Sequence, residues 1–224
     1  MIAGIVVVGV AAIVGVVYLQ YRLKQKRIAS LRAIAAGIGF QFSPADPGDV
    51  LGLDFTLLGK GDGRGVESFI VGQHDGRPVE CFDYWYYDES SDSKGRRSRT
   101  YHRYTCGLLT FEATTPHLSL GRESLLSRIG NALGIDDIEL EYEAFNREFR
   151  VRCDDQRFAF SLLDGQMMEW LLAASDFEAI EVIGSHVLLA RHRAAPEAWP
   201  SLLTFLGALR DHVPSVVFAT YPAP

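Results

Sequence analysis

The densest group of chemically capable side chains is an aromatic block that runs into a basic segment. The block is Phe82-Asp83-Tyr84-Trp85-Tyr86-Tyr87, and residues 88–99 follow it with the sequence DESSDSKGRRSR. Aromatic rings beside arginines can stack on bases and hold phosphates, and they can also anchor a protein interface. The residues that we predict to bind a partner are Tyr84, Trp85, Tyr86, Tyr87, Arg96, Arg97 and Arg99.

Net charge decides between these two kinds of partner. The chain has 22 basic and 28 acidic residues, and residues 1–32 hold five of the basic ones and none of the acidic ones. The rest of the chain therefore carries 17 basic and 28 acidic residues, a net charge of −11. Such a charge argues against a nucleic-acid partner and favours a protein. Alternate residues of a strand face opposite sides, so packing of one face of the aromatic block into a core also stays open.

The sequence lacks complete motifs for cofactor binding and for metal binding. Residues 59–65 read GKGDGRG, but a Walker-type phosphate loop needs a serine or threonine after its lysine and a helix next. Here Lys60 comes early and a strand is expected to follow. The sequence contains no C-x-x-C and no H-E-x-x-H pattern, which zinc sites commonly use. We therefore predict no cofactor and no metal, and we name no catalytic residue.

A membrane-tethered hydrolase is the alternative function. Its site would be assembled from residues that are distant in sequence, such as Asp83, His102 and Asp155. A concave pocket that gathers two or more of these side chains would support a hydrolase, and their dispersal over the surface would argue against it.

A regulatory role for residues 88–99 is a further hypothesis. We expect this segment to be a flexible loop, and its Ser90, Ser91, Ser93 and Ser98 are flanked by charged residues. Phosphorylation there would offset the arginine cluster.

The N-terminal segment has the composition of a membrane anchor. Residues 2–19 carry no charge, and a helix of this length measures about 27 Å, close to the roughly 30 Å of a bilayer's hydrocarbon core. A signal peptide would need a basic start and a small-residue cleavage site, which are missing. We predict a retained transmembrane helix with a basic collar, whose bounding and charged residues are Ile2, Leu19, Arg22, Lys24, Lys26 and Arg27.

The basic collar also predicts the orientation of the chain. Positive charge stays on the inner side of the membrane, so we expect a single-pass protein of the cell membrane with its domain in the cytoplasm. The collar should contact membrane lipid. Three widely spaced cysteines suit a reducing compartment. Ala11 and Gly15 have the small-xxx-small spacing of helix pairs, which leaves a homodimer open.

Periodicity and turn signals divide the chain into three parts. These are a transmembrane helix over residues 1–21, a basic juxtamembrane helix and linker over 22–48, and a soluble α+β domain over 49–224. The juxtamembrane helix should end at Gly37 and Gly39. Asp-Gly at 75–76 between apolar runs predicts a hairpin. Strands are expected over residues 55–58, 66–72, 79–87, 101–113, 138–142, 145–153 and 157–160.

The second half of the domain is expected to mix helices with one more hairpin. Helices are predicted over residues 122–133 and 165–174, the latter with Asp164 as its N-cap, and from Pro196 to Pro214. Strands over 178–183 and 186–192 should form a hairpin around Gly184-Ser185. Antiparallel strands with three or so packed helices and no βαβ rhythm indicate the α+β class.

Two stretches carry a resemblance to a protein family. Residues 78–87 read PVECFDYWYY, and residues 138–172 read IELEYEAFNREFRVRCDDQRFAFSLLDGQMMEWLL. The patterns F-D-Y, F-N-R-x-F-R-V and L-L-D-x-x-M-M-E-W-L-L resemble a family of membrane-anchored proteins of high-GC Gram-positive bacteria. The likeness extends loosely over 30–215 and departs at Cys81 and Cys153. The resemblance implies one domain and a bacterial membrane location, and the family has no assigned activity to transfer.

These observations favour an interaction role over an enzymatic one and leave the hydrolase as the alternative. We expect a protein-interaction or scaffold module at the inner face of the membrane, anchored by its N-terminal helix.

Overall fold

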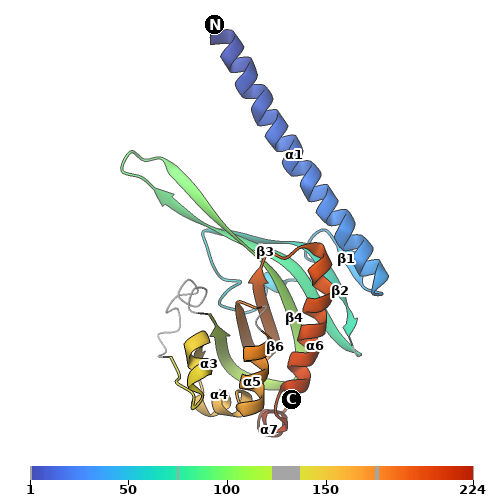
Figure 1. The fold of residues 1–224 in the computed structure, drawn as a ribbon, viewed down its shortest axis with the longest axis vertical. Helices are drawn as coiled ribbons and strands as arrows, with labels where there is room; N and C mark the ends of the chain where they lie inside the picture. Colours follow the sequence, from blue (N-terminus) through green and yellow to red (C-terminus); the bar gives the residue numbers. More distant parts are fainter. Residues whose placement is uncertain (1, 75, 123–136, 175–176, 224) are drawn as a thin grey trace.

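The computed structural model describes residues 2–74, 76–122, 137–174 and 177–223, with the backbone alone for residues 2–10 and 12. It begins with a long helix, α1 (Ile2–Gly37), whose N-terminal part projects away from the rest of the molecule (Figure 1). Large apolar side chains from Ile13 to Leu23 are more than half exposed. Within the described residues, no helix is long and apolar enough to cross a membrane.

The C-terminal part of α1 packs onto the domain. Leu31 and Ala35 are fully buried, four residues apart on one helical face. The helix ends at Gly37, and Gly39 follows with a φ of 76°. The predicted end of the juxtamembrane helix at Gly37 and Gly39 is therefore confirmed, and this helix is the last part of α1.

One antiparallel sheet forms the centre of the domain. The long strand β4 (Arg97–Gly121) pairs along one edge with β3 (Arg77–Ser91) and then β5 (Arg150–Cys153), and along its other edge with β6 (Ala179–His192). Strand β2 (Gly63–His74) pairs with β3, and the short β1 (Gln41–Ser43) closes the sheet. The predicted hairpin around residues 75–76 and the α+β class are confirmed.

Residues 88–99, predicted as a loop, instead continue the two strands. The ladder between β3 and β4 runs to Ser91 opposite Arg97, so the connection is limited to residues 92–96. Glu89 forms an ion pair with Arg99 across the ladder, and such cross-strand pairs stabilise a hairpin. Charge and serine content alone therefore misidentified this segment.

Four predicted strands are wholly or partly helical or irregular. Residues 55–58 form turns after the short 3₁₀ helix η1 (Val50–Gly52), and residues 138–142 lie outside the sheet. The first part of the strand predicted over 145–153 belongs to α3 (Glu143–Glu148), and the second part is extended as β5. The strand predicted over 157–160 lies within α4 (Gln156–Leu162), which Asp155 caps. Short apolar runs do not distinguish strand from helix, and the cap decides here.

The hairpin predicted around Gly184 is also wrong. Strand β6 runs through this position and stays paired with β4 on both sides, with shifts in register. Gly184 has a φ of 57°, and it lies where the register shifts, with the extra residues on β4. The glycine therefore lies within one strand instead of joining two.

The remaining helices cover one face of the sheet. Helix α5 (Gly165–Ala173) is confirmed with its predicted cap, because the Asp164 carboxylate accepts from the Met167 amide at 2.9 Å. The last predicted helix is confirmed as η2 (Pro196–Ala198) and α6 (Trp199–His212), and α7 (Ser215–Thr220) follows Pro214. The helix predicted over 122–133 falls on residues 123–136, which lie outside the described residues.

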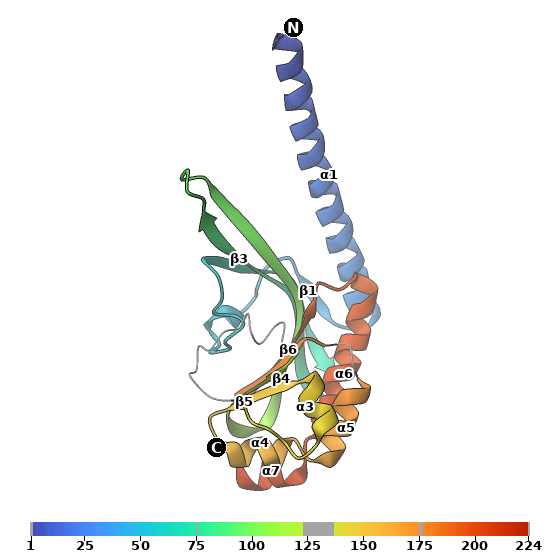
Figure 2. The ribbon, with the colours of Figure 1, turned by 60° about the vertical axis from the view of Figure 1, so that its left-hand side comes forward.

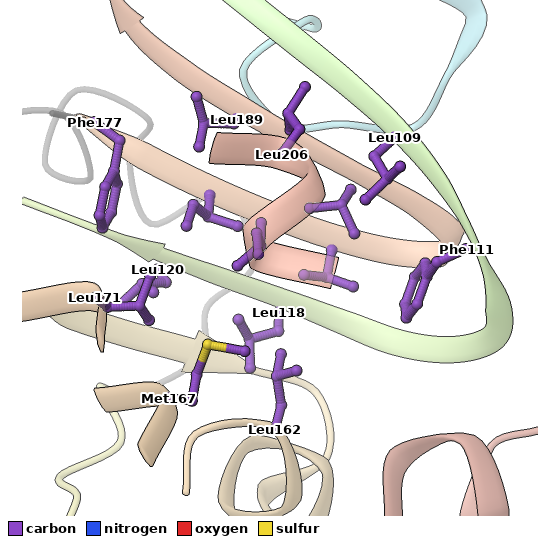
Figure 3. Close-up of a cluster of buried hydrophobic side chains, with 14 of the residues drawn as sticks. Leu109, Phe111, Leu118, Leu120, Leu162, Met167, Leu171, Phe177, Leu189 and Leu206 are labelled. Atoms are coloured by element: carbon purple, nitrogen blue, oxygen red, sulfur yellow. The ribbon is translucent and has the colours of Figure 1, made fainter. Parts of the chain in front are cut away.

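Two apolar layers lie on opposite faces of the sheet. Leucines of β4 pack against Leu162, Met167 and Leu171 of the helices in the first layer, as Figure 3 shows. Helix α6 approaches β4 so closely that a Cβ on Gly107 would lie 2.6 Å from the Leu206 side chain. In the second layer, residues 50–58 cover the other face, and the Tyr84 hydroxyl donates to the carbonyl of Leu57 at 2.9 Å.

Candidate functional site

A buried carboxylate joins the foot of α1 to the sheet. Asp83 of β3 is 2% exposed, and Arg27 of α1 donates to both of its oxygens, at 2.7 Å from Nε and 2.8 Å from Nη2. Thr105 of β4 donates its hydroxyl at 3.0 Å, and Arg193 donates from Nη2 at 3.2 Å. These four bonds occupy the roughly four acceptor positions of a carboxylate. Asp83 therefore holds two arginines in place and has no lone pair left to act as a base.

A second carboxylate extends this network toward the surface. Glu67 lies directly opposite Asp83 in the β2–β3 ladder, so both point to the same face. It accepts from Lys24 at 2.9 Å and from Arg193 at 3.1 Å. A bulge follows Glu67, where Ser68 has a φ of 59°. Asp83 and Glu67 would repel each other, and the cations of α1 and of the segment after β6 neutralise both carboxylates.

An open groove of about 760 Å³ lies over this network. Residues of α1, among them Leu23 and Lys24, form one side, and Trp85, Tyr101 and Arg103 of the β3–β4 hairpin form the other. Figures 1 and 2 show that the hairpin and α1 project from the same end of the molecule. The groove therefore lies between the N-terminal helix and the hairpin.

Aromatic rings and arginines lie next to one another on the hairpin, at Trp85, Tyr87, Arg99, Tyr101 and Arg103. The ring centroids of Trp85, Tyr87 and Tyr101 are 5.4–6.3 Å apart. The guanidinium of Arg99 lies 4.5 Å from the centre of the Tyr87 ring, and that of Arg103 lies 5.1 Å from the centre of Tyr101. Cation–π contacts at these distances hold the arginines against the rings while their charges stay accessible to solvent.

Strand alternation divides the residues predicted to bind a partner. Tyr84 and Tyr86 are 1% and 3% exposed in the second apolar layer, so the structure contradicts their assignment to a binding surface. Trp85 and Tyr87, on the other face, are half-buried. Burial of one face was the packing alternative that the sequence left open.

The predicted arginines all lie at the end of the hairpin and are exposed. Arg96 forms an ion pair with Asp92 at 2.9 Å, and Arg99 with Glu89 at 3.0 Å. Arg97 forms no ion pair with any residue that the structure describes. Partner binding by these arginines stays a prediction.

The residues named for a hydrolase are not brought together. Asp83 is buried beneath the groove, and the ring of His102 stacks on Tyr86 at 4.6 Å, on the opposite face of the sheet. Asp155 caps α4 and accepts from the Tyr221 hydroxyl at 3.1 Å. Each of the three therefore has a separate structural role.

The cysteines are equally unsuited to catalysis. Cys81, Cys106 and Cys153 are free and buried. Burial raises the pKa of Cys153 to about 11 and the pKa values of Cys81 and Cys106 above their usual range, so these thiols stay protonated and poorly nucleophilic. Among the described residues, no group of three or more His, Cys, Asp and Glu side chains could hold a metal ion.

A second buried polar cluster stabilises the opposite face. Glu181 of β6 accepts from the amides of Thr56 and Leu57 at 2.6 and 3.3 Å, and it lies 2.7 Å from Nε2 of His117. The hydrogen bond to Glu181 raises the pKa of His117, although burial acts in the opposite direction. This pair fixes the turns over residues 55–58, and the cavity beside Glu181 has a volume of only about 10 Å³.

The sequence analysis missed several residues of the groove and of the buried network beneath it. Glu67, Thr105 and Arg193 come from β2, β4 and the segment after β6, and none lies in a recognisable motif. The signal that could have found Thr105 is register, because it lies opposite Asp83 in the β3–β4 ladder.

Comparison with known proteins supports the fold. The structure is similar to the crystal structure of the mycobacterial trehalose monomycolate transport factor A, TtfA, with a TM-score of 0.57 and 15% sequence identity. The match covers 88% of this chain and 97% of that chain. No protein-family model matches the chain, and no curated protein matches it. The likeness is therefore one of fold.

Proposed function

We propose that the protein is a single-pass, membrane-anchored interaction module, whose domain lies on the cytoplasmic side and binds a protein partner at the membrane surface. The anchor would be residues 2–19, which carry no charge. Exposure of apolar side chains from Ile13 to Leu23 supports this, because a soluble chain rarely leaves a long apolar surface uncovered. The basic residues from Arg22 to Arg32 support the orientation.

The observation that carries the interaction role is the projecting hairpin. Pairing of β2 with β3 stops at Tyr87, and pairing of β6 with β4 begins at Tyr104. Beyond these positions the two strands pair with each other alone and extend from the body, as Figure 1 shows. An isolated two-stranded hairpin is marginally stable by itself. A projection that adds little to the core is best explained by contact with another molecule.

The partner surface would be the outer part of the hairpin. Tyr87 offers an aromatic anchor, and Arg97 and Arg99 add exposed positive charge. Aromatic residues and arginine are the residue types enriched at protein interfaces. The domain is acidic as a whole, so this basic end favours an acidic patch on the partner over self-association through the same surface.

The fold similarity supports one further part of this proposal, which concerns membrane lipid. TtfA is described as a trehalose monomycolate transport factor. We propose that this chain also serves as an accessory factor in the handling of a membrane lipid, and not as the enzyme that modifies it. The dispersal of Asp83, His102 and Asp155 supports a non-enzymatic role.

Site-specific photo-crosslinking in cells tests the partner role. A photoreactive amino acid at Tyr87 of the full chain should yield one discrete protein adduct, and the same probe at the exposed Phe160 of α4 should not. Arg97→Glu should abolish the adduct, because it reverses the charge at the contact. An adduct that is equal at both positions, or that survives Arg97→Glu, would contradict the proposed surface.

Protease protection tests the anchor and the orientation. A C-terminal tag on the full chain should resist protease added to intact cells whose outer layers have been removed, and it should be digested once the membrane is opened. The protein should also stay in the membrane fraction after an alkaline wash. Digestion in intact cells would overturn the orientation, and release by the wash would overturn the anchor.

A further inference from the structure

The groove between α1 and the hairpin carries an excess of positive charge. Lys24 and Arg193 share Glu67, and Arg27 and Arg193 share Asp83. Arg103 adds a fourth cation, and it forms no ion pair with any of the described residues. Four cations therefore face two carboxylates. This local charge is opposite in sign to the domain as a whole, so the groove is suited to an anionic group.

The groove also begins at the right depth to meet lipid headgroups. Leu19 is the last residue before the polar Gln20, and Lys24 lies five residues after Leu19, or about 7.5 Å along the helix axis. The headgroup layer on each side of the hydrocarbon core is about 5–8 Å thick. If α1 is inserted as proposed, Lys24 reaches the outer edge of this layer, and the hairpin projects toward the same end (Figure 2).

The side of the groove formed by the hairpin has the composition of a membrane interface. Trp85 and Tyr101 line it, and Tyr101 is 45% exposed with Arg103 over its ring. Tryptophan and tyrosine are enriched where membrane and water meet, because each combines an apolar ring with a polar group. Arginine adds paired donors that match the geometry of a phosphate.

One apolar cavity in the described part of the domain is too small for an acyl chain. The apolar cavity between the helices and the sheet, lined by Leu118, Leu162 and Met167 among others, has a volume of about 20 Å³. This is about the room that one water molecule needs, which is about 10–15 Å³ on the same measure. This cavity would therefore not take up the chains of a lipid whose headgroup lies in the groove.

We propose that this groove binds the phosphate headgroup of an anionic phospholipid from the same leaflet in which α1 is anchored. Lys24 and Arg103 contact the phosphate from opposite sides, and Trp85 and Tyr101 pack beside the glycerol region. Arg27 and Arg193 remain paired with Asp83 and supply fixed positive charge at the base of the groove. This inference rests on the proposed anchor, and it adds a lipid site that is separate from the protein surface around Arg97.

The test uses the full chain in lipid nanodiscs that contain phosphatidylcholine, with or without phosphatidylglycerol. A lipid at tenfold its dissociation constant should raise the Tm by about 3–6 °C for a domain of this size. Arg103→Gln should remove most of this rise, and Lys24→Gln should reduce it. Both side chains are exposed, so both variants should fold. Arg147→Gln, an exposed arginine of α3, is the matched control and should keep the full rise.

Each result decides between the possible explanations. A rise that is the same in Arg103→Gln and Arg147→Gln would overturn the groove and assign the effect to the basic collar alone. An equal rise from millimolar inorganic phosphate in pure phosphatidylcholine discs would overturn the lipid as ligand. Absence of a rise in protein that floats with the discs would overturn the headgroup site and leave the anchor intact, whereas protein that fails to insert would contradict the anchor itself.

Discussion

Replacing Asp83 with asparagine should loosen α1 from the sheet and destabilise the domain. The substitution keeps the size of the side chain and an acceptor for Thr105, but it removes the negative charge that Arg27 and Arg193 share. Both guanidinium groups would then lie side by side without their buried partner. The change in the free energy of unfolding therefore measures the electrostatic contribution to the packing of α1 on the sheet.

The expected cost follows from the burial of each partner. Breaking a buried ion pair by removal of one member costs about 3–5 kcal/mol. The Asp83 side chain is 3% exposed, whereas those of Arg27 and Arg193 are 15% and 31% exposed and can recover some hydration. We therefore expect the lower end, about 3 kcal/mol, and a fall in Tm of about 6–12 °C for a domain of this size.

Denaturant unfolding of the full chain in detergent micelles measures this cost. Trp199 is a suitable fluorescent reporter, because it is buried and Arg27 lies over its ring at 6.0 Å. A double-mutant cycle with Arg27→Met should give a coupling free energy of about 2 kcal/mol with Asp83→Asn. Glu143→Gln serves as the control, since its ion pair with Arg147 is exposed on both sides and should contribute under about 0.5 kcal/mol.

Two results would refute this reasoning. A loss of less than about 1 kcal/mol in Asp83→Asn would show that the buried carboxylate is no more important than an exposed one. Strict additivity in the cycle would show that the helix and the sheet are held together by apolar packing and not by this pair.

Three further predictions concern stability. The hydrogen bond to Glu181 raises the pKa of His117, so the contribution of His117 to stability is fully present below its unfolded value of about 6.5 and is lost as the pH rises through the folded value. The free energy of unfolding should therefore fall as the pH rises above about 6.5, by at most about 1.4 kcal/mol per pH unit, and His117→Asn should abolish this slope in urea titrations. Ser68→Gly should raise the free energy of unfolding by about 0.5–1 kcal/mol, since glycine adopts a positive φ without strain. A lower free energy of unfolding for this variant in denaturant titrations would contradict this. Gly107→Ala should cost about 1–3 kcal/mol because its Cβ would press on Leu206, and adding Leu206→Ala should recover part of the Gly107→Ala cost if the contact is the cause.

Local sequence signals located many elements correctly. The end of α1 at Gly37, the hairpin at 75–76 and the Asp164 cap of α5 each depend on residues within a few positions of one another. Capping and turn preferences act over this range, so they are visible in the sequence. The same kind of signal wrongly predicted a hairpin at Gly184, because a glycine with positive φ occurs at a register shift within a strand as well as in a turn.

The candidate site depended on contacts that no local pattern encodes. Arg27 and Asp83 are 56 residues apart, and Arg193 is another 110 residues from Asp83. The aromatic block was found from its composition, but its division into a buried face with Tyr84 and a groove face with Trp85 required knowledge of which side of the sheet α1 covers.

The sequence by itself determined the uncharged N-terminal segment, its basic collar, the acidic charge of the domain and the alternation of the aromatic strand. These properties are sums over residue types or repeats along the chain, so they do not depend on the fold. The tertiary structure alone decided that the collar's Lys24 and Arg27 face a hairpin more than fifty residues away. Strand register and helix docking bring these charges together, because burial of Asp83 is favourable only when both arginines reach it.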